Sequence, residues 1–159
     1  MAPTYVNERG ISLTRNLAAP PDLVWQAWTD PDYLVWFFNP GMTPSQPTTV
    51  DLRVGGAWRQ HMVVNDETQY MTGGVYREIV PKQKLVFEWG AADGWPELNP
   101  DLALLATVQL RPEGEGTRMD FRLQLPDQMS DEEAGKWLGM GIDHGWGMTI
   151  DRLVAQLAK

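Results

Sequence analysis

The segment Ala19–Pro31, APPDLVWQAWTDP, constrains the fold of this chain more than any other segment. Pro21 suits the first turn of a helix, because proline lacks the N–H that this turn leaves unpaired. We expect the helix to run through Trp28. Asp30 is a favourable N-cap for a second short helix, with a proline in its first position. The segment therefore predicts two short helices in immediate succession.

Alternating apolar and polar residues predict β-strands before and after this segment. Ile11–Leu17 reads as a half-buried strand. Asp51–Arg59, DLRVGGAWR, reads as the end of a strand from Val50 to Val54, a Gly-Gly hairpin and a return strand over 57–65. The same alternation predicts further strands over about 69–80, 85–89, 102–111 and 117–125.

The C-terminal segment predicts one long helix from Ser130 to about Ala158. Ser130 and Glu133 have the spacing of a capping box. An apolar stripe at helical spacing should cover the sheet, and it consists of Leu138, Ile142, Trp146, Thr149, Leu153 and Leu157. The first half is rich in glycine, which disfavours a helix interior. Either this half bends or frays, or another backbone approaches it closely.

These elements predict an α+β fold, in which the long C-terminal helix lies across a curved antiparallel sheet of about seven strands. One helix across so wide a sheet leaves volume between them, which favours an internal cavity. The 159 residues fit a single domain over 1–159, with its core at about 11–158.

Composition excludes several classes of function. The net charge is −8 and no run of Lys or Arg occurs, which disfavours nucleic acid and anionic membrane surfaces as partners. The chain has no cysteine, so disulfides, thiol catalysis and thiolate metal sites are excluded. No apolar run is long enough to span a membrane, and the first ten residues lack a signal-peptide pattern. We therefore expect a cytoplasmic protein.

The order of the motifs resembles that of the START/SRPBCC superfamily of helix-grip proteins, and more narrowly the homologues of the activator of the heat-shock-protein-90 ATPase. The resemblance extends from about Ile11 to Lys159. Its motif residues are Arg15, Ala19-Pro20, Val24-Trp25, Ala27–Pro31, Trp36, Asp51–Gly56, Gly74–Tyr76, Gly116–Arg118, Gly145-Trp146 and Leu153.

This resemblance implies a helix-grip fold with a hydrophobic cavity for a small lipid-like or aromatic molecule. It supplies no family-wide catalytic residue. The eukaryotic co-chaperone that gives the family its name carries a further N-terminal domain, which has no counterpart in this sequence.

The candidate cavity residues are large, soft or aromatic side chains on the faces expected to point inward, together with two polar ones that would orient a ligand. They are Trp36, Phe38, Trp58, Gln60, Met62, Tyr76, Phe87, Trp89, Trp95, Met119, Phe121 and Trp146. A filled core without a usable cavity is the alternative. We expect Trp25 and Trp28 to serve structural packing instead.

Catalytic and metal-binding groups are sparse. The candidates for acid–base chemistry are Tyr76, Glu78 and Glu88, but alternation turns Glu88 away from the core. His61 and His144 are the only histidines, and both are expected to point outward. We therefore predict no catalytic residue, no metal and no cofactor.

The sequence favours binding of a small hydrophobic or aromatic molecule without assigned catalysis. A cyclase- or hydrolase-like enzyme acting in the same cavity is one alternative, and a chaperone-associated stress-response module is another. The outer face of the C-terminal helix has an apolar stripe typical of an interface, which predicts a homodimer contact or a covering loop. Its residues are Trp137, Met140, His144 and Met148.

Overall fold

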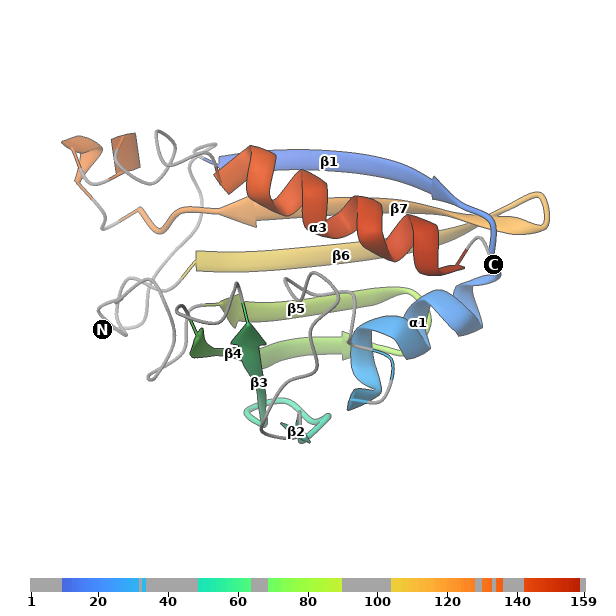
Figure 1. Cartoon of the computed structure of the whole chain (residues 1–159), viewed down its shortest axis with the longest axis horizontal. Coiled ribbons are helices and arrows are strands. Elements are labelled where there is room, and N and C mark those ends of the chain that lie inside the picture. The colour runs from blue at the N-terminus through green and yellow to red at the C-terminus, as the bar shows by residue number, and fades with distance from the viewer. Residues whose placement is uncertain are drawn as a thin grey trace.

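The computed structural model describes residues 10–31, 33, 49–63, 69–89, 104–127, 130–132, 134–135 and 142–157, with the backbone alone at 57, 61–63, 69–73 and 142–145. Within these described residues, two helices pack against a seven-stranded antiparallel sheet (Figure 1). The helices are α1 (Pro21–Thr29) and α3 (Ile142–Leu157). The strands are β1 (Gly10–Leu17), β2 (Thr49–Val50), β3 (Ala57–Val63), β4 (Gln69–Val80), β5 (Lys84–Trp89), β6 (Leu104–Glu113) and β7 (Gly116–Gln124).

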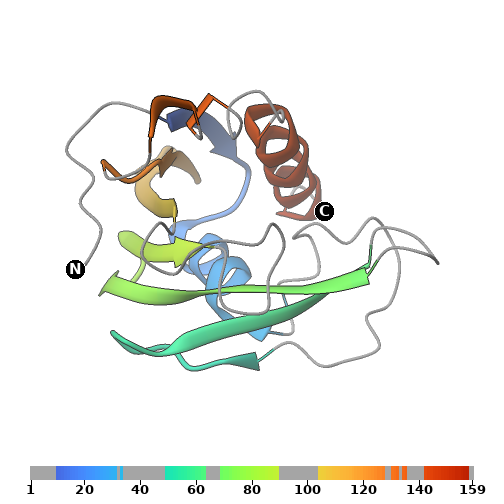
Figure 2. The ribbon, with the colours of Figure 1, turned by 90° about the vertical axis from the view of Figure 1, so that its left-hand side faces the viewer.

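The strand order is β1-β7-β6-β5-β4-β3-β2. Hairpins connect neighbours from β2 to β7, and β7 then pairs with β1 from Gly10↔Gln124 to Leu17↔Thr117. The first and second strands thus form opposite edges of the sheet, and the chain must cross the sheet between them. The sheet curves so that α1 and α3 both lie on its concave side (Figure 2). This arrangement confirms the expected fold class.

Alternation along the strands separates a buried inner face from a polar outer face. In β7, Thr117, Met119, Phe121 and Leu123 are buried, while the residues between them are partly or fully exposed. The inner faces of β5 and β6 continue this core, and α3 covers it with Trp146, Ile150 and Leu153. The long apolar stripe predicted for the C-terminal helix therefore does face the sheet where the structure describes its side chains.

The expected strand from Val50 to Val54 is wrong beyond its first residue. Strand β2 ends at Val50, and the next residues form tight turns in which Arg53 N donates to Asp51 O and Gly56 N to Arg53 O. These local bonds use backbone groups that a ladder would need. Val54 is consequently 64% exposed. The hairpin itself is confirmed, because Val50 still pairs with Trp58.

The helix boundaries agree with the sequence signals where the structure describes them. Helix α1 begins at Pro21, and its last turn closes with Asp30 N donating to Gln26 O. Tyr33 N donates to Asp30 O at 2.9 Å, the turn expected of a second helix, but most of that helix lies outside the described residues. Near the predicted C-terminal helix start, Ala134 N donates to Ser130 O. Residues 136–141, between this turn and α3, also lie outside them.

Candidate functional site

A continuous series of aromatic rings covers the inner face of the sheet. Trp58 on β3 meets Phe87 on β5 edge-on, with ring centroids 5.5 Å apart. At the α3 side, Trp146 stacks on Phe121 at 4.6 Å and meets Trp89 edge-on at 5.3 Å. Such tilted and offset geometries are the favourable ones for aromatic pairs. Five of the candidate cavity residues therefore form the two parts of an aromatic layer.

Trp28 of α1 joins the two parts of the aromatic layer. Its ring lies 6.3 Å from that of Phe87 and 6.1 Å from that of Phe121. Its indole N–H points at the Met119 sulfur, with 3.3 Å between Nε1 and Sδ. Trp28 was expected to serve packing and was not among the candidate site residues. The period of α1 placed it on the buried face, but only the tertiary contact shows which rings it touches.

Strand register explains why the aromatic layer can be so dense. Trp58 lies opposite Gly74 across the β3–β4 pair, and Gly74 in turn lies opposite Trp89. A Cβ at Gly74 would collide with the carbonyl oxygen of Glu88 and would touch the ring of Phe87. Glycine thus leaves the space in which three aromatic side chains converge.

Two polar side chains lie within the aromatic layer. Gln60 on β3 is 1% exposed and accepts a hydrogen bond from Trp58, with 3.2 Å between Nε1 and Oε1. Tyr76 on β4 is also 1% exposed. Burial, and secondarily the nearby charge of Asp51, raises the pKa of the Tyr76 hydroxyl far above its ordinary value. The phenol therefore stays protonated and able to donate a hydrogen bond.

The turn after β2 holds Asp51 close to Tyr76. Gly55 N donates to Tyr76 O at 2.8 Å, and Tyr76 N donates to Gly56 O at 2.9 Å. Gly55 has a φ of +86°, which glycine adopts without strain. A Cβ on Gly56 would collide with Asp51, so this residue leaves room for the turn to close. The Asp51 carboxylate also binds Arg53 at 2.8 Å.

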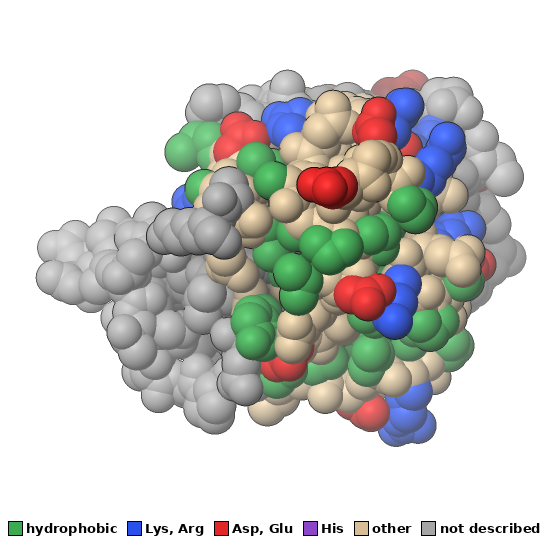
Figure 3. Space-filling view, turned by 90° about the vertical axis from the view of Figure 1, so that its right-hand side faces the viewer, with side chains coloured by type: hydrophobic (Ala, Val, Ile, Leu, Met, Phe, Trp, Pro, Cys, Tyr) green, Lys and Arg blue, Asp and Glu red, His purple; other side chains and the backbone are tan. Residues whose placement is uncertain are grey.

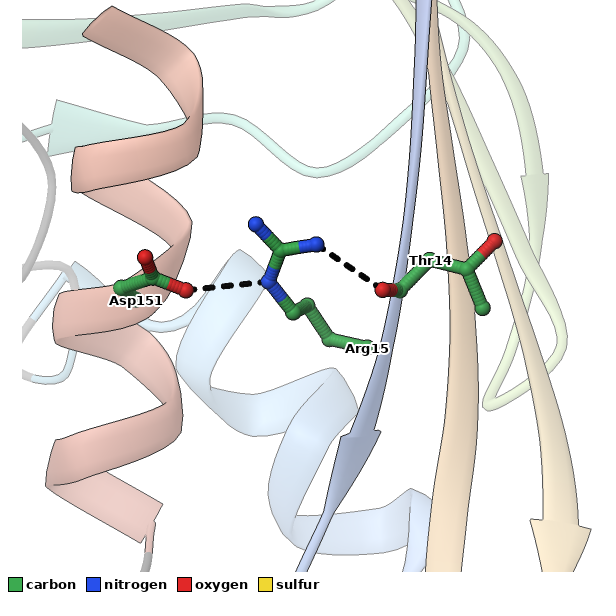
Figure 4. A network of polar contacts seen from close by, with 3 residues as sticks. All are labelled: Thr14, Arg15 and Asp151. Atoms are coloured by element: carbon green, nitrogen blue, oxygen red, sulfur yellow. Dashed lines mark hydrogen bonds and ion pairs between the residues drawn. The ribbon is translucent and has the colours of Figure 1, made fainter. Parts of the chain in front are cut away.

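An ion pair attaches α3 to the edge of the sheet (Figure 4). Arg15 projects from β1 toward the helix, and its Nε donates to Asp151 Oδ1 at 2.9 Å. Its Nη1 donates to the carbonyl oxygen of Thr14 at 2.9 Å, which orients the guanidinium. Arg15 faces inward in the register, opposite Met119. It therefore lies on the inner side of the β1 edge, where it binds α3.

The two candidate acidic residues lie on the outer face. Glu78 binds Lys84 at 3.0 Å, and Glu88 forms an ion pair with Arg77. Glu88 faces away from the core as expected, although its side chain is only 18% exposed. Of the residues considered for acid–base chemistry, Tyr76 is the one whose described side chain lies in the interior.

A family model described as "Activator of Hsp90 ATPase homolog 1-like protein" matches residues 18–158. The chain belongs to this family. The match includes α1, all strands after β1 and α3, so it covers every element that contributes an aromatic ring to the interior.

Solved structures of similar proteins share this family member's fold. A protein from Nitrosomonas europaea superposes with a TM-score of 0.77 at 26% identity, covering 96% of this chain and 97% of its own. An uncharacterized protein from Rhizobium leguminosarum gives 0.71 at 26% identity, covering 94% and 93%. One from Mycobacterium smegmatis gives 0.70 at 27% identity, covering 94% and 90%. No curated protein matches the chain.

Several predicted site residues of this family member lie outside the described residues. Trp36, Phe38 and Trp95 are among them, and the side chain of Met62 is not described although β3 includes its backbone. The remaining candidates are all buried in the inner layer: Trp58, Gln60, Tyr76, Phe87, Trp89, Met119, Phe121 and Trp146. Their role in binding stays a prediction.

The predicted dimer contact rests on residues that the structure describes only in part. Trp137 and Met140 lie outside the described residues, as does the side chain of His144. Met148 is 52% exposed on α3. At the end of the molecule where α1 lies, hydrophobic and charged side chains are mixed on the surface (Figure 3). Leu23 of α1 is 47% exposed. The homodimer stays a prediction.

The described part of the chain offers no metal centre, since no group of three His, Asp or Glu side chains within it is placed to hold an ion. The side chain of His61, like that of His144, is outside this part. Among the helices that are described, none is long and apolar enough to cross a membrane.

A hollow of about 430 Å³ lies on the outer face of the sheet, across β1, β7, β6 and β5. Ser12, Thr14, Lys84, Asp120 and Arg122 contribute to its lining, and Thr14 Oγ1 donates to Asp120 at 2.8 Å. Its polar lining differs from the apolar cavity that the sequence predicts. It lies on the opposite side of the sheet from the aromatic layer.

Proposed function

We propose that this family member binds a small hydrophobic or aromatic molecule against the inner face of its sheet. The observation that carries the proposal is the aromatic layer, in which Trp58, Phe87, Trp28, Phe121, Trp146 and Trp89 meet ring to ring. Apolar walls with a small number of placed polar groups are typical of sites for such molecules. Gln60 and Tyr76 supply those groups here.

The chemistry of the interior favours binding over catalysis. The described acidic candidates, Glu78 and Glu88, are engaged with cations on the outer face. A cyclase- or hydrolase-like reaction would have to rely on Tyr76, whose hydroxyl holds its proton too firmly to act as a base near neutral pH. A cyclase- or hydrolase-like enzyme is therefore the second candidate.

The test measures binding of a panel of fatty acids, sterols and aromatic polyketides by isothermal titration calorimetry. We expect saturable binding of at least one member with a stoichiometry near one. Gln60→Leu should weaken that binding about tenfold, because a ligand-orienting amide in the inner layer is lost. Gln109→Leu is the matched control, because Gln109 is exposed on the outer face of β6, and it should leave binding unchanged.

Absence of saturable binding across the whole panel would overturn this proposal. Equal effects of the two leucine variants would place the ligand elsewhere than the inner layer. The chaperone alternative predicts that the purified protein stimulates a heat-shock-protein-90 ATPase. A protein that stimulates this ATPase and binds no panel member would replace the proposed function by that alternative.

A further inference from the structure

The polar groups buried beside Trp58 are uncharged. Gln60 accepts a hydrogen bond from the Trp58 indole N–H on β3, and Tyr76 is buried on the inner face of β4. In the strand register, Gln60 lies opposite Thr72 and Trp58 opposite Gly74, two residues before Tyr76. A flat molecule that stacks on Trp58 would thus have an amide on one side and a phenol on the other.

The surroundings of Tyr76 oppose a second negative charge. The turn of residues 51–56 closes on the Tyr76 backbone through two hydrogen bonds, with the Asp51 carboxylate packed against Gly56. Burial and this carboxylate raise the pKa of the phenol. Both causes would act in the same way on a ligand carboxylate placed there, because a buried charge loses its hydration and like charges repel.

Two partly buried cations lie on the other side of the interior. Arg15 belongs to the edge strand β1 and is bound to Asp151. Arg152 belongs to α3, which packs on β1, and its Nη2 donates to Thr149 Oγ1 at 3.4 Å. Strands β7, β6 and β5 separate β1 from the strand that carries Tyr76. A ligand carboxylate beside Tyr76 would therefore gain little from either arginine.

We infer that the Trp58–Gln60–Tyr76 group selects uncharged aromatic ligands that carry a hydrogen-bond acceptor, such as ketones or esters, over the corresponding carboxylates. The inference rests on the proposed function and narrows its ligand class. Tyr76 donates its O–H to the ligand oxygen, while Trp58 offers its ring face. Burial, and secondarily the half-exposed Asp51 carboxylate that is bound to Arg53, disfavours the ionised acid.

Three naphthalenes of similar size separate the contribution of the hydrogen-bond acceptor from that of the ligand charge. 2-Acetylnaphthalene carries a neutral acceptor, 2-ethylnaphthalene carries none, and 2-naphthoate carries a carboxylate. Calorimetry at pH 7.5 should give the ketone an affinity about tenfold higher than either of the others, the size expected for one hydrogen bond in a buried site. The Tyr76→Phe variant should bind the ketone with only the affinity that it has for the ethyl compound.

Two further variants provide controls. Tyr33→Phe removes a phenol from a residue that is 44% exposed, and it should leave all three affinities unchanged. Asp51→Asn should raise the affinity for 2-naphthoate about threefold, because it removes the neighbouring negative charge. Far-UV circular dichroism of each variant verifies that the fold is retained.

Each outcome supports or overturns a distinct claim. Binding of 2-naphthoate as tight as that of the ketone would overturn the inference and leave the proposed function standing, and loss of that binding in Arg152→Gln would locate the carboxylate at α3. An unchanged ketone preference in Tyr76→Phe would also overturn the inference. No saturable binding of any of the three compounds would count against the proposed function itself.

Discussion

Trp58 lies directly opposite Gly74 in the β3–β4 ladder, and its ring meets that of Phe87 on β5 edge-on, with 5.5 Å between the ring centroids. A Cβ at position 74 would collide with the Glu88 carbonyl oxygen and would touch the ring of Phe87. Cross-strand pairs of an aromatic residue with glycine allow the ring to lie over the bare backbone. Glycine at position 74 therefore leaves room for the Phe87 ring beside the backbone of β4.

Replacing Gly74 should destabilise the protein. In Gly74→Ala the new Cβ would collide with the Glu88 carbonyl oxygen, and overpacking of this kind costs about 1–3 kcal/mol. Urea unfolding followed by tryptophan fluorescence would measure the loss. Gly135→Ala is the matched control, because Gly135 is helical with open space around it. That variant should gain about 0.5–1 kcal/mol. A neutral Gly74→Ala would contradict the close approach.

Removing the ring of Trp28 should have a larger effect. Trp28 is buried between Phe87 and Phe121, so Trp28→Ala leaves a cavity and is expected to cost about 3–5 kcal/mol of unfolding free energy. Leu23→Ala on the same helix changes an exposed side chain and should stay within about 0.5 kcal/mol. Chemical denaturation of the two variants provides the comparison. Similar losses in both would show that α1 contributes through helix formation rather than through the aromatic layer.

The ion pair between Arg15 and Asp151 should contribute little to stability. Both side chains retain solvent contact, and pairs of this kind typically contribute about 0–1 kcal/mol. A double-mutant cycle with Arg15→Gln and Asp151→Asn would measure the coupling, which should fall as salt rises. A coupling above about 2 kcal/mol, insensitive to salt, would identify this contact as a principal attachment of α3.

Alkaline pH should destabilise the protein through Tyr76. Its pKa in the folded state is raised by burial from an ordinary value of 10.0. The Tyr76 hydroxyl therefore loses its proton at a higher pH in the folded protein than in the unfolded chain. The contribution of Tyr76 is fully present below pH 10 and is lost as pH rises further, by up to about 1.4 kcal/mol per pH unit.

The comparison with Tyr76→Phe isolates this contribution from the other groups that titrate at high pH. Unfolding free energies of both proteins would be measured by urea denaturation between about pH 8 and 11. The difference in unfolding free energy between the wild type and Tyr76→Phe should be constant up to about pH 9.5. Above this pH the wild type should lose stability relative to the variant. Parallel curves over the whole range would show that the Tyr76 hydroxyl is accessible to water in the folded state.

Local sequence signals predicted most of the fold. Alternation located β1, β4, β5 and β7 to within about two residues, and the proline at position 21 marked the first residue of α1. The same alternation failed at Leu52 and Val54, which lie in turns rather than in a strand. Hydrogen bonds among Asp51, Arg53 and Gly56 override the alternating pattern there.

The candidate site was predicted less completely. Alternation correctly put Trp58, Gln60, Phe87 and Phe121 on the inner face, because the side-chain period of a strand is a local property. It gave no reason to include Trp28, since a helix periodicity shows which face is buried but not which residues lie opposite. The proximity of Asp51 to Tyr76 was also not predictable, because it depends on how a turn closes on a strand twenty residues later.

Patterns within a few residues predicted the family, the order of strands and helices along the chain, and the division of each strand into an inner and an outer face. Tertiary structure alone decided which inner side chains meet. The placement of Trp28 between Phe87 and Phe121, the space left at Gly74 and the attachment of Arg15 to Asp151 join residues far apart in the chain. Register and helix docking set these contacts, and both depend on the packing of the whole sheet.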